Sequence, residues 1–279
     1  MSTGISTYKL VMGQGSELEN LRIFVINRKQ DVDRRRTIAQ RLDAIGLTPE
    51  YIDAIDGYSM DAFAAPEYDR SRRLLYFGRD LAAGEIGCLL SHRLVYKKIM
   101  EEEIGISLIL EDDAHFAADF PEVLQQVIEA KDNWDMVRFL DRPKIFKAPH
   151  RIVHKLSDKY SIARIRGVPG GAYAYLLKHH AAEVLLAKSQ HSTVQIDIVH
   201  GRYWETGLNV LVTKPSPVVP DMDIDSTIGD GRFMKENTTN GFRKLFFPIF
   251  RFLFKLNTSI RARLYYAKMK KADQRNWEN

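Results

Sequence analysis

Apolar residues gather in short runs along this chain, and some of the segments between these runs carry a helical repeat. Residues 21–26 are rich in apolar and β-branched residues, which predicts an interior strand. In the charged segment 33–45, apolar residues recur at spacings of four and three and predict a helix with one buried side. A second extended run follows at 51–57. Strand, helix and strand within about 35 residues form a βαβ unit, so we expect a parallel sheet.

The alternation continues along the rest of the chain. Further strands are expected at 106–110, 134–140, 161–166, 172–177 and 208–213. Helices are expected at 84–103, from Phe120-Pro121 onward, and at 181–188. The segments 58–82 and 141–160 lack clear periodicity and are predicted to be irregular, the first with room for a short helix.

The run 106–110 leads directly into three adjacent carboxylates, Glu111, Asp112 and Asp113. Ligands of open α/β sheets bind outside the carboxyl ends of such strands. Three neighbouring negative charges repel one another and are costly to desolvate, so they need water or a cation. Residues two apart on an extended chain point the same way, so Glu111 and Asp113 are placed to share a divalent ion. A solvated acidic turn is the alternative explanation.

Charge is divided unevenly along the 279 residues. Residues 242–279 hold ten of the 41 Lys and Arg residues and two of the 36 acidic residues, which gives this segment +8 and leaves −3 on the rest. A slightly acidic body argues against a nucleic-acid-binding protein, and the basic segment predicts an anionic partner. Within it, residues 245–256 are aromatic and apolar with interspersed bases. This pattern predicts an in-plane membrane segment, with a helix docked on the body or on another subunit as the alternative.

Composition narrows the remaining classes of protein. Apolar residues make up 45% and charged residues 28% of the chain, as in an ordinary globular protein. The single cysteine, Cys88, excludes an internal disulfide framework and fits a cytoplasmic protein, with a buried packing thiol favoured over a nucleophile. Residues 1–20 show no secretory signal and are expected to be a flexible lead-in. We find no apolar run of about 20 residues that would predict a transmembrane helix.

Three further features carry polar groups that have more than one explanation. Glycines at the start of the helix 84–103 suit either close approach to a phosphate or tight packing, and Ser91 and His92 lie beside its apolar side. The triplet Arg34–Arg36 is either a solvated helix side or a nucleotide contact. Asp197 is the one acid in an apolar tract, so it is a helix cap, a paired charge or a general base.

Four ordered motifs resemble glycosyltransferase family 25, the bacterial lipooligosaccharide and lipopolysaccharide galactosyl- and glucosyltransferases with the related collagen galactosyltransferases. The motifs are Ile26-Asn27 with Arg34-Arg35, the segment 53–57, the segment 84–92 and the segment 110–113. The similarity covers about residues 21–227. Arg28 replaces the usual leucine after the asparagine, and the arginine-rich stretch 142–166 matches no motif, which leaves the acceptor open.

The resemblance implies an α/β, GT-A-like fold with a mainly parallel central sheet flanked by helices. We expect a single nucleotide-sugar-binding domain at 21–241 and a basic, amphipathic membrane-association segment at 242–279. The implied reaction is inverting transfer of a hexose, galactose before glucose, from a UDP-sugar to a lipid-linked lipopolysaccharide or lipooligosaccharide core acceptor. The implied location is the inner face of the cytoplasmic membrane. The sequence leaves the oligomeric state open.

The resemblance also assigns roles to residues of this chain. Mn²⁺ or Mg²⁺ would be held by Glu111, Asp112 and Asp113. The nucleotide and the donor pocket would involve Asn27, Arg35, Ser91 and His92. Asp197 is the candidate base that takes the proton of the acceptor hydroxyl. Two rival functions remain: a metal-dependent phosphohydrolase or nucleotidyltransferase using the same acidic cluster, and a non-catalytic, membrane-docked module that binds glycans or nucleotides.

Overall fold

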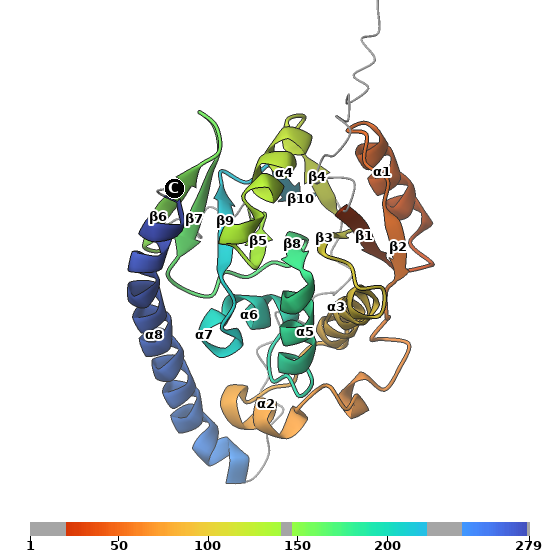
Figure 1. Ribbon diagram of the computed structural model, residues 1–279. Helices are drawn as coiled ribbons and strands as arrows, with labels where there is room; N and C mark the ends of the chain where they lie inside the picture. The colour runs from red at the N-terminus through yellow and green to blue at the C-terminus, as the bar shows by residue number, and fades with distance from the viewer. Residues whose placement is uncertain (1–20, 141–146, 222–241, 278–279) are drawn as a thin grey trace, which may run out of the picture.

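The structure is a computed structural model that describes residues 21–140, 147–221 and 242–277, so the expected lead-in at 1–20 lies outside the described residues (Figure 1). The helices are α1 (Val32–Asp43), α2 (Arg70–Phe77), α3 (Ala83–Glu101), α4 (Phe120–Glu129), α5 (His179–Lys188), α6 (Ile196–Gly201), α7 (Tyr203–Thr206) and α8 (Phe242–Trp277), with 3₁₀ helices η2 (Ala62–Ala64) and η3 (Lys131–Asn133). The strands are β1 (Leu21–Asn27), β2 (Glu50–Asp53), β3 (Ile106–Glu111), β4 (Ala114–Phe116), β5 (Met136–Arg138), β6 (His150–Lys155), β7 (Ser161–Ile165), β8 (Ala174–Lys178), β9 (Val210–Lys214) and β10 (Val218–Pro220).

Within the described residues, the central sheet has eight strands in the order β2-β1-β3-β8-β5-β9-β7-β6, and β4 pairs separately with β10. β1 is parallel to β2 and β3, as the βαβ pattern predicts, and β5 is parallel to β9. β8 runs antiparallel between β3 and β5, and β7 is antiparallel to both β9 and β6. The predicted α/β architecture, a central sheet flanked by helices, is confirmed, with parallel pairing concentrated at the β2-β1-β3 edge.

Both faces of the sheet are covered (Figure 1). On β1, Ile23 and Val25 pack into a core that includes side chains of α1 and α4, whereas Phe24 and Ile26 pack into a second core with α3 and α5. Successive side chains of a strand point to opposite faces, so a strand covered on both sides must be apolar at nearly every position. This explains why 21–26 and 106–110 were recognisable from the sequence as runs with a single polar residue each, Arg22 and Ser107.

Three strands were not expected from the sequence: the short pair β4 and β10, and the longer β6. The segment 141–160, predicted to be irregular, contains β6, which pairs antiparallel with β7 at the edge of the sheet. Its sequence HRIVHK carries bases at both ends, and most of its side chains are partly exposed. An edge strand needs no buried apolar side at every second residue, and charges there protect it from pairing with other chains.

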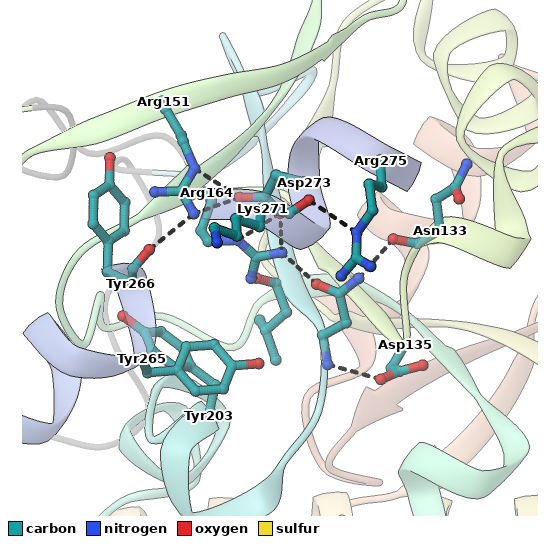
Figure 2. Close-up of polar contacts among 12 residues, drawn as sticks. Asn133, Asp135, Arg151, Arg164, Tyr203, Tyr265, Tyr266, Lys271, Asp273 and Arg275 are labelled. Atoms are coloured by element: carbon teal, nitrogen blue, oxygen red, sulfur yellow. Dashed lines mark hydrogen bonds and ion pairs between the residues drawn. The ribbon is translucent and has the colours of Figure 1, made fainter. Parts of the chain in front are cut away.

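Helix α8 runs along one flank of the body and is fixed there by a buried ionic cluster (Figures 1 and 2). Asp273 of α8 is 5% exposed and accepts hydrogen bonds from Arg164 of β7 at 2.6 and 2.9 Å and from Arg151 of β6 at 2.7 Å. Further along the helix, the ring of Phe254 lies 5.0 Å from the ring of Phe77 on α2. One side of α8 is therefore docked on the body, which is the alternative that the sequence left open for this segment.

The opposite side of α8 is apolar and exposed. Its side chains recur at helical spacings of three and four, so they form one stripe, which we call the α8 stripe: Leu245, Ile249, Phe252, Leu253, Leu256, Ile260 and Leu264. Among the residues that the structure describes, no helix combines the length and the apolar character needed to cross a membrane.

Candidate active site

The polar residues predicted to form a site collect where β1, β2 and β3 end, beside the start of α3. Ile26 of β1 is level with Glu111 of β3 in the parallel register, so the residues that follow these two strands lie next to each other. A cavity opens at this edge. Six of the predicted residues line it: Asn27, Ser91, His92, Glu111, Asp112 and Asp113. The sequence therefore predicted the location of the cavity and most of its polar lining.

Asp112 is held by partners on two other elements. The Asn27 side-chain amide donates to its Oδ2 at 2.7 Å, and Nε of Arg34 donates to its Oδ1 at 2.9 Å, with a second Arg34 nitrogen completing the ion pair. Asp112 is 6% exposed, and a carboxylate this buried needs a partner. Arg34 supplies the matching positive charge inside the protein. These contacts tie β1, β3 and α1 together at the floor of the cavity.

Arg35, predicted to bind the nucleotide, lies outside the cavity lining. Its guanidinium carbon lies 4.0 Å from the ring centre of Tyr51 on β2. Successive helical residues are turned by about 100° from one another, so α1 aims Arg34 at Asp112 and Arg35 at the neighbouring strand. The arginine of this triplet that lines the cavity is Arg34.

Glu111 and Asp113 have no Lys or Arg ion-pair partner among the described residues. Burial, and to a lesser extent the negative charge of Glu111, raise the pKa of the Asp113 carboxyl, Arg34 opposes this rise, and the net pKa is about 7. Oδ1 of Asp113 is buried without a hydrogen-bond partner in the described part of the chain. Two carboxylates that lack a cation and face a cavity fit a hard divalent ion, which prefers oxygen ligands.

Cys88 and His92 lie one helical turn apart on α3 and both face Glu111. The Cys88 thiol donates to Oε1 of Glu111 at 3.8 Å, and Nε2 of His92 lies 3.2 Å from the same oxygen. Burial raises the pKa of the Cys88 thiol well above its usual value, with Glu111 and Asp197 adding to the effect. Cys88 is therefore held as a neutral thiol. It lines the wall of the cavity, whereas the sequence predicted a buried thiol that serves packing.

A chain of buried hydrogen bonds runs from Glu111 into the core. His92 Nδ1 lies 2.7 Å from the hydroxyl of Tyr175 on β8, which lies 3.0 Å from the hydroxyl of Tyr96 on α3. The Tyr96 hydroxyl in turn lies 2.6 Å from Nε2 of His200 on α6. Burial lowers the pKa of His200 well below its usual value, so the chain ends in a neutral imidazole. These contacts fix the orientation of the His92 ring.

Ser91 has a positioning role besides lining the cavity. Its hydroxyl accepts a hydrogen bond from the backbone N–H of Ile55 at 2.8 Å and donates to the carbonyl of Gly87 at 2.7 Å. The backbones of the second and third motifs touch here. A Cβ at Gly87 would lie 2.5 Å from the carbonyl oxygen of Ile55, and one at Gly57 would lie 1.9 Å from that of Ala83. Both positions therefore require glycine, which explains the glycine spacing as close packing.

Asp197, predicted to be the base, lies in the first turn of α6 and outside the cavity lining. Its Oδ2 accepts a hydrogen bond from the backbone N–H of Gly171 at 2.8 Å, and its Oδ1 has no partner in the described part of the chain. Its charge raises the pKa of Cys88 and opposes the lowering of the pKa of buried Arg138. Asp197 thus lies behind Cys88 and holds the loop that leads into β8.

Tyr96, Tyr175 and His200 were not singled out by sequence reasoning. Their contacts join residues between 79 and 104 positions apart, and they depend on β8 entering the sheet antiparallel beside β3. No local pattern marks that pairing. Cys88 and His92, in contrast, are four residues apart on a predicted helix, and this spacing alone places both side chains on one side.

The sequence is similar to those of known proteins of one family. The sequence model of the family described as glycosyltransferase family 25 (LPS biosynthesis protein) matches residues 20–200. Procollagen galactosyltransferase 1-A of Xenopus laevis is 30% identical over 135 residues, which is 44% of this chain and 21% of that protein. Human procollagen galactosyltransferase 2 is 28% identical over 144 residues, 49% of this chain and 23% of the relative. The human protein named inactive glycosyltransferase 25 family member 3 is 27% identical over 177 residues, which is 59% of this chain and 28% of that protein.

The match thus spans between 21% and 28% of the length of these relatives. The family match extends from β1 to α6 and includes every residue that the structure brings to the cavity. Because this match covers well over half of the sequence, the chain belongs to glycosyltransferase family 25.

Proposed function

We propose that this protein is an inverting hexosyltransferase that moves a hexose from a UDP-sugar to a lipopolysaccharide or lipooligosaccharide core. The observation that carries the proposal is the pair Glu111 and Asp113, two carboxylates at a strand end that face a cavity without a Lys or Arg partner among the described residues. Membership of a glycosyltransferase family supports sugar transfer. Galactose is the proposed hexose because relatives are named procollagen galactosyltransferases, and glucose is the alternative.

Glu111 and Asp113 would hold Mn²⁺ or Mg²⁺ through carboxylate oxygens. When bound, such an ion neutralises the negative charge that develops on the diphosphate leaving group. Asp112 was predicted as a third ligand, but both of its oxygens are taken by Asn27 and Arg34. In the proposal it fixes the strand end so that the residues on either side of it keep their orientation.

The donor would lie in the cavity against residues of three elements. Asn27 at the end of β1 and Ser91 and His92 on α3 form part of its lining. Arg34 supplies a cation near the proposed diphosphate position, which is the role the sequence gave to Arg35. A guanidinium that pairs with a buried acid is well ordered and loses little further freedom when a phosphate group is bound.

Asp197 is the proposed base that accepts the proton of the attacking hydroxyl. Its support is an oxygen without a hydrogen-bond partner among the described residues, on a carboxylate close to the cavity wall at Cys88. The Asp197→Asn variant keeps the shape of the side chain and loses its basicity, so we expect a fall in kcat of at least about 100-fold. Near-normal turnover would refute this assignment.

The proposed acceptor is lipid-linked, and the α8 stripe would hold the enzyme on the inner face of the cytoplasmic membrane. The stripe points away from the docked side of α8, and basic residues of the same helix are exposed beside it, among them Lys255, Arg261 and Lys268. An amphipathic helix lies in the interface through its apolar side, and bases near anionic lipid add about 1 kcal/mol each. Holding the enzyme at the membrane raises its encounter frequency with a lipid acceptor.

Membrane binding is best tested by substitution, because deletion of 242–279 would leave Arg164 buried without Asp273. We expect the triple variant Ile249→Ser, Phe252→Ser and Leu256→Ser to lose vesicle binding by at least about tenfold in flotation with anionic lipid. The matched control replaces the exposed apolar residues Val32, Met60 and Ile152, which lie elsewhere, by serine. Equal partitioning of the two variants would contradict the proposed anchor.

The reaction is tested by incubating the full chain with a panel of UDP-sugars, Mn²⁺ and a lipopolysaccharide core glycolipid, followed by mass spectrometry and linkage analysis. A product one hexose heavier with inverted configuration is expected. Asp113→Ala should abolish the product while the circular dichroism spectrum is retained, and Asp158→Ala, an exposed acid paired with Lys155, is the control. Phosphate release without acceptor would favour the phosphohydrolase. UDP binding without turnover would favour a non-catalytic module. This outcome is a real alternative because one relative is named an inactive glycosyltransferase.

A further inference from the structure

Three different side chains converge on one point in the wall of the cavity. Cys88 and His92 project from adjacent turns of α3, and Glu111 ends β3. The thiol sulfur lies 3.8 Å and His92 Nε2 lies 3.2 Å from Oε1 of Glu111, and the three ligand atoms all lie within 4.8 Å of one another. A thiol, an imidazole and a carboxylate are the three side-chain types that bind zinc in proteins.

Two of the separations are close to those of a tetrahedral zinc site. With bonds of about 2.3 Å to sulfur and about 2.0–2.1 Å to nitrogen and oxygen, ligand atoms lie roughly 3.3 Å apart for nitrogen and oxygen and roughly 3.6 Å apart for sulfur and oxygen. The corresponding distances from Glu111 Oε1 are 3.2 Å to His92 Nε2 and 3.8 Å to the Cys88 sulfur. All three residues line the cavity, so a fourth position would open toward it.

The surroundings of His92 also suit a metal ligand. A ligating histidine offers one ring nitrogen to the ion and donates the N–H of the other to a fixed partner, which sets its tautomer. Here Nε2 faces Glu111 and Nδ1 lies 2.7 Å from the Tyr175 hydroxyl, which Tyr96 supports in turn. The imidazole ring is therefore already oriented to bind an ion through Nε2.

We propose that Cys88, His92 and Glu111 form a zinc site in the cavity, which shares Glu111 with the proposed pair Glu111 and Asp113 but takes its other two donors from α3. A thiolate is a soft ligand that favours Zn²⁺ over Mg²⁺ or Mn²⁺. On binding, Cys88 gives up its thiol proton to solvent and its sulfur bonds to the ion, while His92 binds through Nε2 as a neutral imidazole with its single proton on Nδ1, any proton on Nε2 leaving to solvent. Because Glu111 belongs to both sets, Zn²⁺ excludes the ion that the proposed transfer needs. Zinc would therefore inhibit the enzyme.

The test uses Co²⁺ as a spectroscopic substitute for Zn²⁺ in the full chain. Cys88 is the only cysteine, so a thiolate-to-cobalt charge-transfer band reports on this residue alone. We expect the band to saturate at one Co²⁺ per chain and to vanish when Zn²⁺ is added. Cys88→Ser should abolish it, Tyr175→Phe should weaken Co²⁺ binding about 10–100-fold, and Asp113→Asn should retain it.

A measurement on the unmodified protein guards against misfolded variants. Zn²⁺ should slow alkylation of Cys88 at least about tenfold, whereas Mn²⁺ at the same concentration should not. The inference is overturned if the folded wild-type protein shows no thiolate band, or if Cys88→Ser binds Zn²⁺ as tightly as the wild type by calorimetry. Neither readout requires sugar transfer, so transfer with Mn²⁺ in the absence of these signals would refute the zinc site and leave the proposed function intact.

Discussion

Two ionic clusters of the protein differ in charge balance. Under α8, the single acid Asp273 meets the guanidinium groups of Arg164 and Arg151, so its negative charge is fully matched (Figure 2). At the cavity, Glu111 and Asp113 have no such partner in the described part of the chain, and Asp113 is held near neutrality instead. A matched cluster holds elements together, whereas an unmatched one costs stability until a cation arrives. The first cluster is structural and the second fits a binding site.

Asp112 makes the same comparison within three consecutive residues. It lies between the two unmatched carboxylates in the sequence, yet Arg34 matches its charge. Of the three neighbouring acids, Asp112 therefore has a structural role, whereas Glu111 and Asp113 are the proposed metal ligands. The substitutions below test this division, from the largest expected effect to the smallest.

Removing the acid of the matched cluster should have the largest effect. Asp273→Ala leaves Arg164 buried without its partner, and we expect a loss of about 3–5 kcal/mol in the free energy of unfolding, measured with urea. The control Asp158→Ala removes an exposed pair with Lys155 and should cost less than about 1 kcal/mol. A loss at Asp273 as small as that of the control would mean that α8 is not anchored by this cluster.

In the unmatched cluster, removing a carboxylate should raise the free energy of unfolding, whereas removing Asp273 lowers it. Folded Asp113 keeps its proton up to about pH 7, whereas in the unfolded chain it loses the proton near its ordinary value of 3.8, so stability falls as pH rises between the two. Asp113→Asn removes this fall. At pH 8 without metal, the variant should be more stable by on the order of 2–3 kcal/mol, at about 1.4 kcal/mol per pKa unit and allowing for the nearby charges.

Thermal unfolding from pH 4 to pH 8 in metal-free buffer checks this expectation. At pH 4 the wild-type protein and Asp113→Asn should be alike, because both then lack a charge at this position. At pH 8, added Mn²⁺ should stabilise the wild type and leave the variant unchanged. A variant that is less stable than the wild type at pH 8 would contradict the unmatched state of Asp113.

Removing the partner of Asp112 should have the smallest effect. Arg34→Gln leaves the Asp112 carboxylate with Asn27 alone and should cost about 1–3 kcal/mol. The double variant Arg34→Gln with Asp112→Asn should recover most of that loss, as a double-mutant cycle in urea would show. No recovery would mean that Arg34 acts through its other contacts and that the charge of Asp112 needs no match.

Much of the fold followed from local pattern, and the exceptions share a cause. The runs 21–26 and 106–110 are apolar because both faces of their strands are covered. β6 escaped detection because it lies at the edge of the sheet, where partly exposed bases are tolerated. The antiparallel entry of β8 between β3 and β5 joins distant parts of the chain, and no local signal encodes such a pairing.

The candidate site was predictable in its location and less so in its details. The strand ends placed Asn27 and the three carboxylates together, since parallel strands end at the same edge. The roles within the arginine triplet depend on the rotation of α1, which sets Arg34 against Asp112 and Arg35 against Tyr51. Charge matching at Asp112 is likewise a property of the folded chain, because Arg34 lies 78 residues away.

The contact between Gly57 and Gly87 has a consequence for engineering this protein. The two residues lie 30 positions apart, yet their backbones leave no room for a Cβ on either one. A redesign that transplants or diversifies one of these two segments must therefore carry the other with it, as a single cassette. Libraries aimed at a new donor sugar should keep both glycines fixed and vary the neighbouring Tyr58 and Cys88, whose side chains line the cavity.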